Sequence, residues 1–96
     1  MKKFQATIHF DMDDDFMSLI PEHREYISSL IQEGVIDQYL VSMESQRVWI
    51  TFTAEKKEDV DQYLRKSPIH RYWTYDIDEL FLIDGQHYRL PVLQMN

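Results

Sequence analysis

The sequence of 96 residues contains no cysteine, which excludes a disulfide framework and any chemistry that needs a thiolate. This absence suits the cytoplasm, where disulfides are rare. Only two residues are glycine, which argues against long loops built on that residue. No apolar run is long enough to cross a bilayer, and the first residues lack the apolar core of a secretory signal. We therefore expect a single cytoplasmic domain without a membrane segment.

Positive charge is also scarce. Lys and Arg number 10 against 17 Asp and Glu, so the formal net charge is -7. Nucleic acids and anionic membranes bind to basic protein surfaces, so we expect neither of them as a partner. Hydrophobic residues at 44% and aromatic residues at 14% are sufficient for a packed core. A chain of this length buries roughly two-thirds of its unfolded surface, so its stability should be modest.

A strand is predicted over residues 4–12, where apolar and polar residues alternate. Its apolar face should pack against helices, and its other face carries His9 and Asp11. The three acidic residues 13–15 then end the strand. Because they lack the spacing of a calcium-binding loop, we interpret them as a solvated loop and not as a metal site.

The first helix is predicted over residues 21 to about 33. Proline suits its first position, and Gly34 suits the left-handed residue that follows a helix. One stripe at helical spacing contains mainly apolar residues and is expected to face the sheet: His23, Ile27, Leu30, Ile31 and Gly34. Tyr26 borders this stripe, three residues after His23.

Two further strands are predicted over residues 37–44 and 47–54, joined as an antiparallel hairpin by a short turn. A second helix should follow over residues 56–66 and end at Ser67-Pro68, because a residue before proline avoids the helical region. A fourth strand is predicted over residues 75–83.

The sequence Asp84-Gly85 is typical of a two-residue hairpin, so residues 86–93 should form an extra C-terminal β segment. Pro91 places that segment at an edge or on a neighbouring chain.

The order of these elements predicts an α+β, ferredoxin-like βαββαβ fold, with a four-stranded antiparallel sheet and two helices on one face. The opposite face should carry His9, Asp11, Trp49, Thr51 and Thr53. Large exposed patches of this kind mark interfaces or pockets. Two sheets packed face to face would cover it, which predicts a homodimer in the form of an α+β barrel.

The sequence resembles the dimeric α+β barrel superfamily and is nearest to muconolactone isomerase-like proteins. The similarity covers residues 4–83. It rests on Tyr26, Leu30 and Gly34 in the first helix, the hairpin from Tyr39 to Phe52, the stretch Leu64-Arg65-Lys66-Ser67-Pro68-Ile69, and Tyr72. The resemblance implies a homodimer, or a higher homo-oligomer, that moves a double bond in a small unsaturated lactone by proton transfer without a cofactor.

In this comparison, His23 stands where the family carries a glutamate, one turn before Tyr26. Imidazole can replace the carboxylate as a base, because its unperturbed pKa lies nearer neutrality. The change also fits another substrate or a protein that does not catalyse a reaction. Under the catalytic hypothesis, His23 is the base and Tyr26 donates a hydrogen bond to the substrate. Otherwise His23 is a core histidine held by a hydrogen bond, and Tyr26 packs at an interface.

Polar residues outside the first helix are candidates for substrate binding. His9 and Asp11 form a carboxylate–imidazole pair typical of proton-transfer sites, and YciI-like relatives are thought to use a His and an Asp; the alternative is a polar dimer interface. Arg71 is suited to a substrate carboxylate, or else to a surface ion pair. His70 lies beside it. No pair of histidines has tight ligand spacing, so we expect no metal.

Aromatic residues supply the remaining candidates. Tyr72 and Trp73 follow the second helix, and Trp49 lies in the third strand. Each is expected either in the core or interface or in the apolar wall of a small-molecule pocket.

Three functions therefore remain open. The first is a cofactor-independent isomerase or lyase acting on small unsaturated acids or lactones. The second is a dimer without catalytic activity that binds a small molecule or only assembles. The third is a cofactor-free monooxygenase or YciI-like enzyme. The isomerase hypothesis requires a cavity that both His23 and Tyr26 face.

Overall fold

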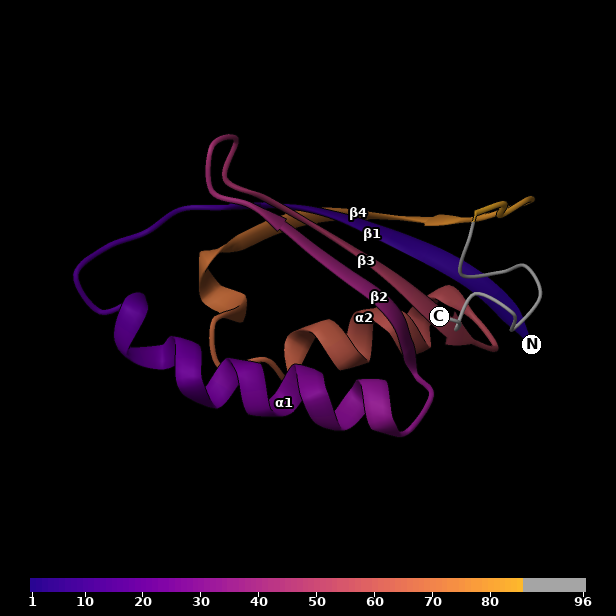
Figure 1. The fold of residues 1–96 in the computed structure, drawn as a ribbon, viewed down its shortest axis with the longest axis horizontal. Helices are drawn as coiled ribbons and strands as arrows, with labels where there is room; N and C mark the ends of the chain where they lie inside the picture. Colours follow the sequence, from indigo (N-terminus) through magenta and orange to yellow (C-terminus); the bar gives the residue numbers. More distant parts are fainter. Residues whose placement is uncertain (86–96) are drawn as a thin grey trace, which may run out of the picture.

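Four strands and two main helices make up most of residues 1–85, which are the residues described by the computed structural model (Figure 1). Along the chain they are β1 (Lys2–Phe10), the short 3-10 helix η1 (Met17–Leu19), α1 (Ile20–Gln32), β2 (Ile36–Ser42), β3 (Arg47–Ala54), α2 (Lys57–Arg65), the 3-10 helix η2 (His70–Tyr72) and β4 (Trp73–Glu79).

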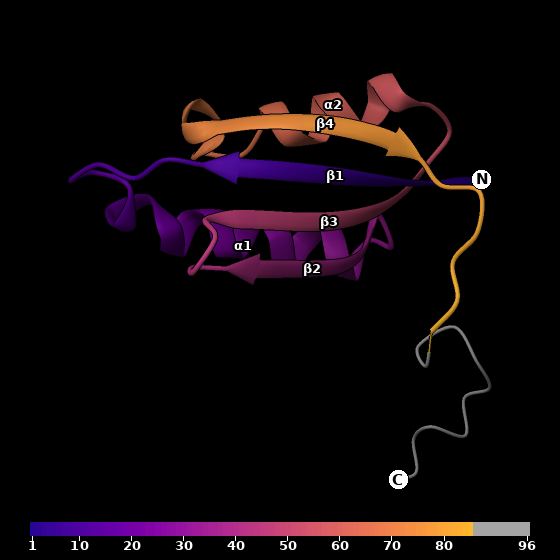
Figure 2. The ribbon, with the colours of Figure 1, turned by 90° about the horizontal axis from the view of Figure 1, so that it is seen from above.

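The strands form one antiparallel sheet in the order β2-β3-β1-β4. Helices α1 and α2 lie on the same face of this sheet, α1 beneath β2 and β3 and α2 beneath β4 (Figures 1 and 2). This βαββαβ arrangement is the ferredoxin-like topology, which confirms the fold predicted from the order of the elements.

The core lies between the sheet and the helices. Alternate residues of β1 point into it, as the period of two in the sequence predicts: Phe4, Ala6, Ile8 and Phe10. Helix α2 contributes Val60 and Leu64. Helix α1 contributes His23, Ile27 and Leu30, but Ile31 is 45% exposed. Gly34, the last residue of the expected stripe, is also exposed and lies beyond the end of α1. The stripe predicted for α1 was therefore too wide by these two residues.

Gly34 ends α1 as predicted. Its φ of 81° lies in the left-handed region that glycine adopts without steric cost. The backbone N–H groups of Gly34 and Val35 donate to the carbonyl oxygens of Ile31 and Leu30, at 3.1 and 2.9 Å. These bonds close the last turn and direct the chain into β2.

Several predicted boundaries were wrong, mostly by one or two residues. Strand β1 covers Lys2–Phe10 and not residues 4–12, because its partners begin at Arg47 and Trp73. Strand β3 has the predicted bounds, whereas β2 and both helices are shorter or displaced.

The fourth strand differs most from its prediction. It begins at Trp73 and ends at Glu79, not at residue 83. The backbone N–H of Leu80 still donates to the Lys3 carbonyl at 2.8 Å. Lys3 is the second residue of the partner strand β1, so β1 extends too little beyond it to pair with the residues after Leu80. Without a partner, Phe81 is fully exposed and Leu82 is 72% exposed. The extra segment expected over residues 86–93 lies outside the described residues.

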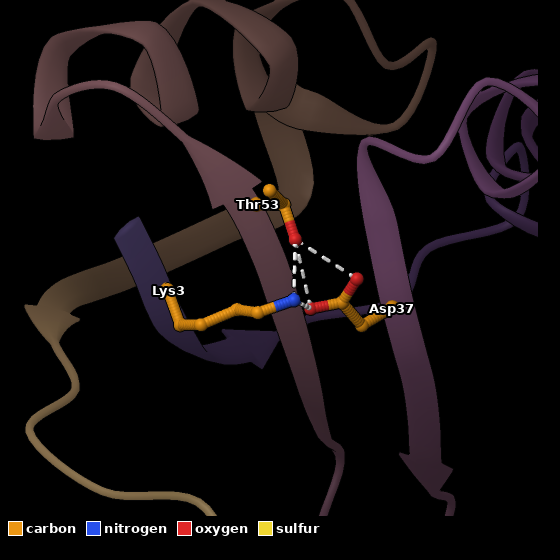
Figure 3. Close-up of polar contacts among 3 residues, drawn as sticks. All are labelled: Lys3, Asp37 and Thr53. Atoms are coloured by element: carbon orange, nitrogen blue, oxygen red, sulfur yellow. Dashed lines mark hydrogen bonds and ion pairs between the residues drawn. The ribbon is translucent and has the colours of Figure 1, made fainter. Parts of the chain in front are cut away.

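The sheet face opposite the helices has a polar cluster at one end. The ammonium of Lys3 in β1 lies 2.8 Å from a carboxylate oxygen of Asp37 in β2 and 2.7 Å from the hydroxyl oxygen of Thr53 in β3 (Figure 3). The Thr53 hydroxyl is also 3.0 Å from both Asp37 oxygens. One cluster therefore ties three neighbouring strands together across the open face.

We expect the substitution Lys3→Met to lower the free energy of unfolding by about 1–2 kcal/mol, because it removes charge-assisted hydrogen bonds from a carboxylate whose side chain is only 17% exposed. Lys2→Met is the matched control. Lys2 pairs with Glu79 at 3.9 Å with both side chains more than half exposed, and such pairs contribute little. Urea unfolding of both variants measures the difference, and equal losses would contradict the assigned role of the cluster.

None of the helices within residues 1–85 is long and apolar enough to span a membrane.

Candidate functional site

A pocket of about 210 Å³ opens between the beginning of α1 and the end of the sheet where the β2–β3 hairpin turns. Its lining is mostly apolar. It consists of Phe10, Phe16, Met17, Ile20, His23, Arg24, Tyr39, Val41, Met43, Val48, Ile69 and Trp73. Met17, Val41 and Met43 are each about half exposed, so they form its rim, whereas Phe10, Val48 and Ile69 are buried at its base.

Phe16 forms a wall of this pocket and is held from two sides. Its ring stacks on Phe10 with 5.5 Å between centroids, and Tyr72 meets it edge-on at 5.1 Å. The loop before it is fixed by Asp13, whose carboxylate accepts from the backbone N–H of Phe16 at 3.1 Å and from the Tyr72 hydroxyl at 2.8 Å. The exposed acidic run thus has a structural role beside the pocket.

His23 provides the most deeply buried polar group of the lining, with 1% of its surface exposed. Its Nδ1 lies 2.8 Å from the Ser67 Oγ, and its Nε2 lies 2.7 Å from the Tyr39 hydroxyl. The indole of Trp73 packs against the imidazole in a T-shaped arrangement at 5.5 Å. Burial, with a smaller effect of the neighbouring Arg24 charge, lowers the pKa of His23 to about 4. The imidazole is therefore neutral at pH 7.

Tyr39 carries the other polar group at this end of the pocket. It projects from β2 on the helix-facing side, opposite Ile50 of β3. Burial raises the pKa of its phenol to about 12, so the hydroxyl keeps its proton at neutral pH and can donate it.

Trp73 contributes a donor without a partner. The residue is 7% exposed, and among residues 1–85 its Nε1 is the one buried side-chain nitrogen or oxygen that makes no hydrogen bond. Its place beside His23 explains the burial, because the ring fills the space between the start of β4 and α1.

Tyr26 lies outside the pocket lining. Its hydroxyl donates to the backbone carbonyl of Tyr63 at 2.5 Å and so joins α1 to α2. Burial raises the pKa of this phenol to about 12. The structure therefore does not bring Tyr26 and His23 together at one cavity, and the catalytic roles assigned to them stay predictions.

The candidates from the open sheet face also lie away from the pocket. His9 is exposed in β1 between Arg47 and Thr74 of the neighbouring strands. Asp11 is exposed just after β1, and its backbone N–H donates to the Tyr72 carbonyl. Trp49 is half-buried in β3 on the face that carries Thr7 and Leu40.

The three predicted site residues in the segment after α2 make contacts outside the pocket. His70 Nε2 is 3.4 Å from the Tyr75 hydroxyl, on the side of α2. Arg71 donates to the Tyr72 hydroxyl at 2.7 Å and stacks over that ring. None of the three residues His70, Arg71 and Tyr72 lines the pocket, although Tyr72 holds Phe16 in place.

Tyr39 and Ser67 were not predicted as site residues from the sequence. Tyr39 had one usable signal, since the alternation of β2 puts it on the same face as Val41. Ser67 was interpreted mainly as the end of the helix. Its backbone does continue that end, with the N–H donating to the Leu64 carbonyl at 3.2 Å, but its side chain also reaches His23.

Comparison with models of protein families and with curated proteins gives no match to this chain. Within residues 1–85, no three His, Asp or Glu side chains are grouped so that they could hold a metal ion. The pocket and its hydrogen bonds are therefore the basis for a functional proposal.

Proposed function

We propose that this protein binds a small, predominantly apolar molecule in the pocket beside His23. The observation that carries the proposal is the combination of a mostly apolar lining with two hydrogen-bonded polar side chains, the buried His23 and the half-buried Tyr39. Ligand sites in proteins have this composition, with apolar walls that supply affinity and a few fixed polar groups that set orientation.

The size of the pocket limits the ligand. Apolar cavities of about 150 Å³ in other proteins bind benzene. A pocket of about 210 Å³ therefore suits a compound with a single ring or a short branched chain. Its half-exposed rim, formed by Met17, Val41 and Met43, gives such a compound a route of entry. Methionine side chains adapt their shape readily, which favours a rim that opens without strain.

Proton transfer by a muconolactone isomerase-like enzyme is the second candidate. It is favoured by the neutral imidazole of His23 in the pocket lining. Two observations make binding the stronger proposal. A base whose pKa is about 4 accepts a proton poorly at pH 7, and both ring nitrogens already have partners. The expected oxyanion donor, Tyr26, bonds to the Tyr63 carbonyl elsewhere.

A homodimer also remains a proposal. It is supported by Trp49 and Leu40, which are cross-strand neighbours on the open sheet face, Leu40 with 49% of its surface exposed. Sedimentation equilibrium tests the homodimer, and a monomer mass at all protein concentrations would contradict it.

The test of binding uses the fluorescence of Trp73, isolated in a Trp49→Phe variant because Trp49 lies on the other face of the sheet. We expect saturable changes on titration with single-ring compounds, and NMR shifts that concentrate at Phe16, Ile20 and Val48. The absence of saturable binding across a panel of neutral and anionic compounds would refute the proposal. Proton exchange of bound small lactones in deuterated water, lost in His23→Ala, would instead support the isomerase.

A further inference from the structure

We infer that Ser67 and His23 form a positioning relay, a chain of hydrogen bonds that leaves the hydroxyl proton of Tyr39 directed to the pocket. The ligand is then an apolar compound with a carbonyl-type oxygen that accepts a hydrogen bond from Tyr39. This inference rests on the proposed function and identifies the chemical class of its ligand. It is built from four hydrogen-bonding groups, Ile69 N–H, Ser67 Oγ, His23 and Tyr39, taken in that order.

The relay begins at the turn after α2. The backbone N–H of Ile69 donates to the Ser67 Oγ at 3.2 Å, so this oxygen already accepts one hydrogen bond. Ser67 is 5% exposed, and the described residues offer its hydroxyl proton one acceptor, the Nδ1 of His23 at 2.8 Å. Leaving a buried donor without an acceptor costs roughly 1–3 kcal/mol. The hydroxyl therefore donates to Nδ1.

The tautomer of His23 follows from this step. An Nδ1 that accepts a proton from Ser67 carries none of its own, so the neutral ring holds its proton on Nε2. That Nε2–H then donates to the Tyr39 oxygen at 2.7 Å. In the other tautomer, Ser67 Oγ would accept hydrogen bonds from both the Ile69 N–H and the His23 Nδ1–H, and its own hydroxyl proton would remain buried without an acceptor. The first arrangement satisfies all of these groups.

Tyr39 completes the relay. Because its oxygen accepts from His23, its own proton has to find another acceptor. The side chain is half-buried and lines the pocket, so this proton can reach water there or a ligand atom. A ligand with an acceptor oxygen replaces the water, whereas a ligand that is only a hydrocarbon displaces the water and leaves the donor unpaired.

The charge at the pocket further limits the class of ligand. Among residues 1–85, Arg24 is the one residue of the pocket lining with a formal charge, and its side chain is exposed. A neutral ketone and a carboxylate both present an acceptor oxygen of this kind to Tyr39. The arginine favours the carboxylate.

The experiment compares acetophenone, benzoate and ethylbenzene, which share a ring and differ in the acceptor. In the Trp49→Phe background we expect acetophenone and benzoate to bind more tightly than ethylbenzene. Tyr39→Phe should weaken binding of the two oxygen compounds by about 3- to 10-fold and leave ethylbenzene unchanged. Arg24→Gln should weaken the binding of benzoate alone, because acetophenone and ethylbenzene carry no charge.

The outcomes separate this inference from the proposed function. If none of the three compounds binds, the pocket proposal fails. If all three bind equally, or if Tyr39→Phe affects them equally, the pocket stands and the relay is refuted.

A second measurement needs no variant, because ¹⁵N shifts of the imidazole in the wild-type protein report the tautomer. They should show a protonated Nε2 and an unprotonated Nδ1 for His23, and a proton on Nδ1 overturns the relay even if the variants fail to fold.

Discussion

At pH 4 the free energy of unfolding is expected to be about 3 kcal/mol lower than at pH 7 through His23 alone. Burial lowers the pKa of this residue from 6.5 to about 4 in the folded protein. Between pH 6.5 and pH 4, His23 is therefore protonated in the unfolded chain and remains neutral in the folded protein. The contribution of His23 to the free energy of unfolding is fully present above pH 6.5 and is lost as the pH falls through this window. Its size follows from the pKa shift, because each pKa unit is equivalent to about 1.4 kcal/mol.

The physical cause is the cost of a cation at the position of His23. The ring is 1% exposed, the aromatic rings of Trp73 and Tyr39 lie against it, and the charge of Arg24, which also lowers its pKa, has the same sign as a protonated imidazole. A charged imidazole would have to donate from both nitrogens, so Ser67 would have to turn its proton away from Nδ1. No carboxylate forms an ion pair with the ring among residues 1–85.

The control for this prediction is His23→Gln, which keeps hydrogen-bonding groups and cannot titrate. Urea unfolding from pH 7 to pH 4 measures both proteins. Carboxylates such as Asp13 and Asp61, whose pKa values are lowered by hydrogen bonds from Tyr72 and Tyr75, titrate in both and cancel in the difference. A wild-type protein that loses no more stability than His23→Gln over this window would contradict the prediction.

The fold could be predicted largely because its signals are local. The alternation over residues 4–10, the glycine after α1 and the apolar positions Val60 and Leu64 each fix an element from neighbouring residues alone. The end of β4 could not be found in this way. Residues 80–83 continue an extended pattern, but a strand lasts only as long as its partner, and β1 begins at Lys2.

The site was less predictable for the same physical reason. The position of His23 on the inner stripe of α1 follows from helical spacing, but its partners are 16 and 44 residues away in the sequence. Tyr39 and Ser67 meet the imidazole only because the sheet and both helices pack as they do. His9 and Asp11 carry the more familiar pairing of residue types, yet both are exposed away from the pocket.

A second large effect is expected at Phe16. The substitution Phe16→Ala should lower the free energy of unfolding by about 3–5 kcal/mol, the usual loss for a buried phenylalanine. The side chain is 4% exposed and is held between Phe10 and Tyr72, so its removal leaves a cavity that the neighbouring rings cannot fill without giving up their own contacts. Urea unfolding measures this loss.

Met17→Ala is the matched control for this prediction. The residue is adjacent, lines the same pocket and is 62% exposed, so its truncation should cost less than about 1 kcal/mol. Because the space left by Phe16 adjoins the pocket, a single-ring ligand in excess should restore part of the stability lost in Phe16→Ala. Equal losses in the two variants would mean that the loop over residues 11–16 does not close the pocket. A large loss without recovery by ligand would mean that the space left by Phe16 does not join the ligand-binding pocket.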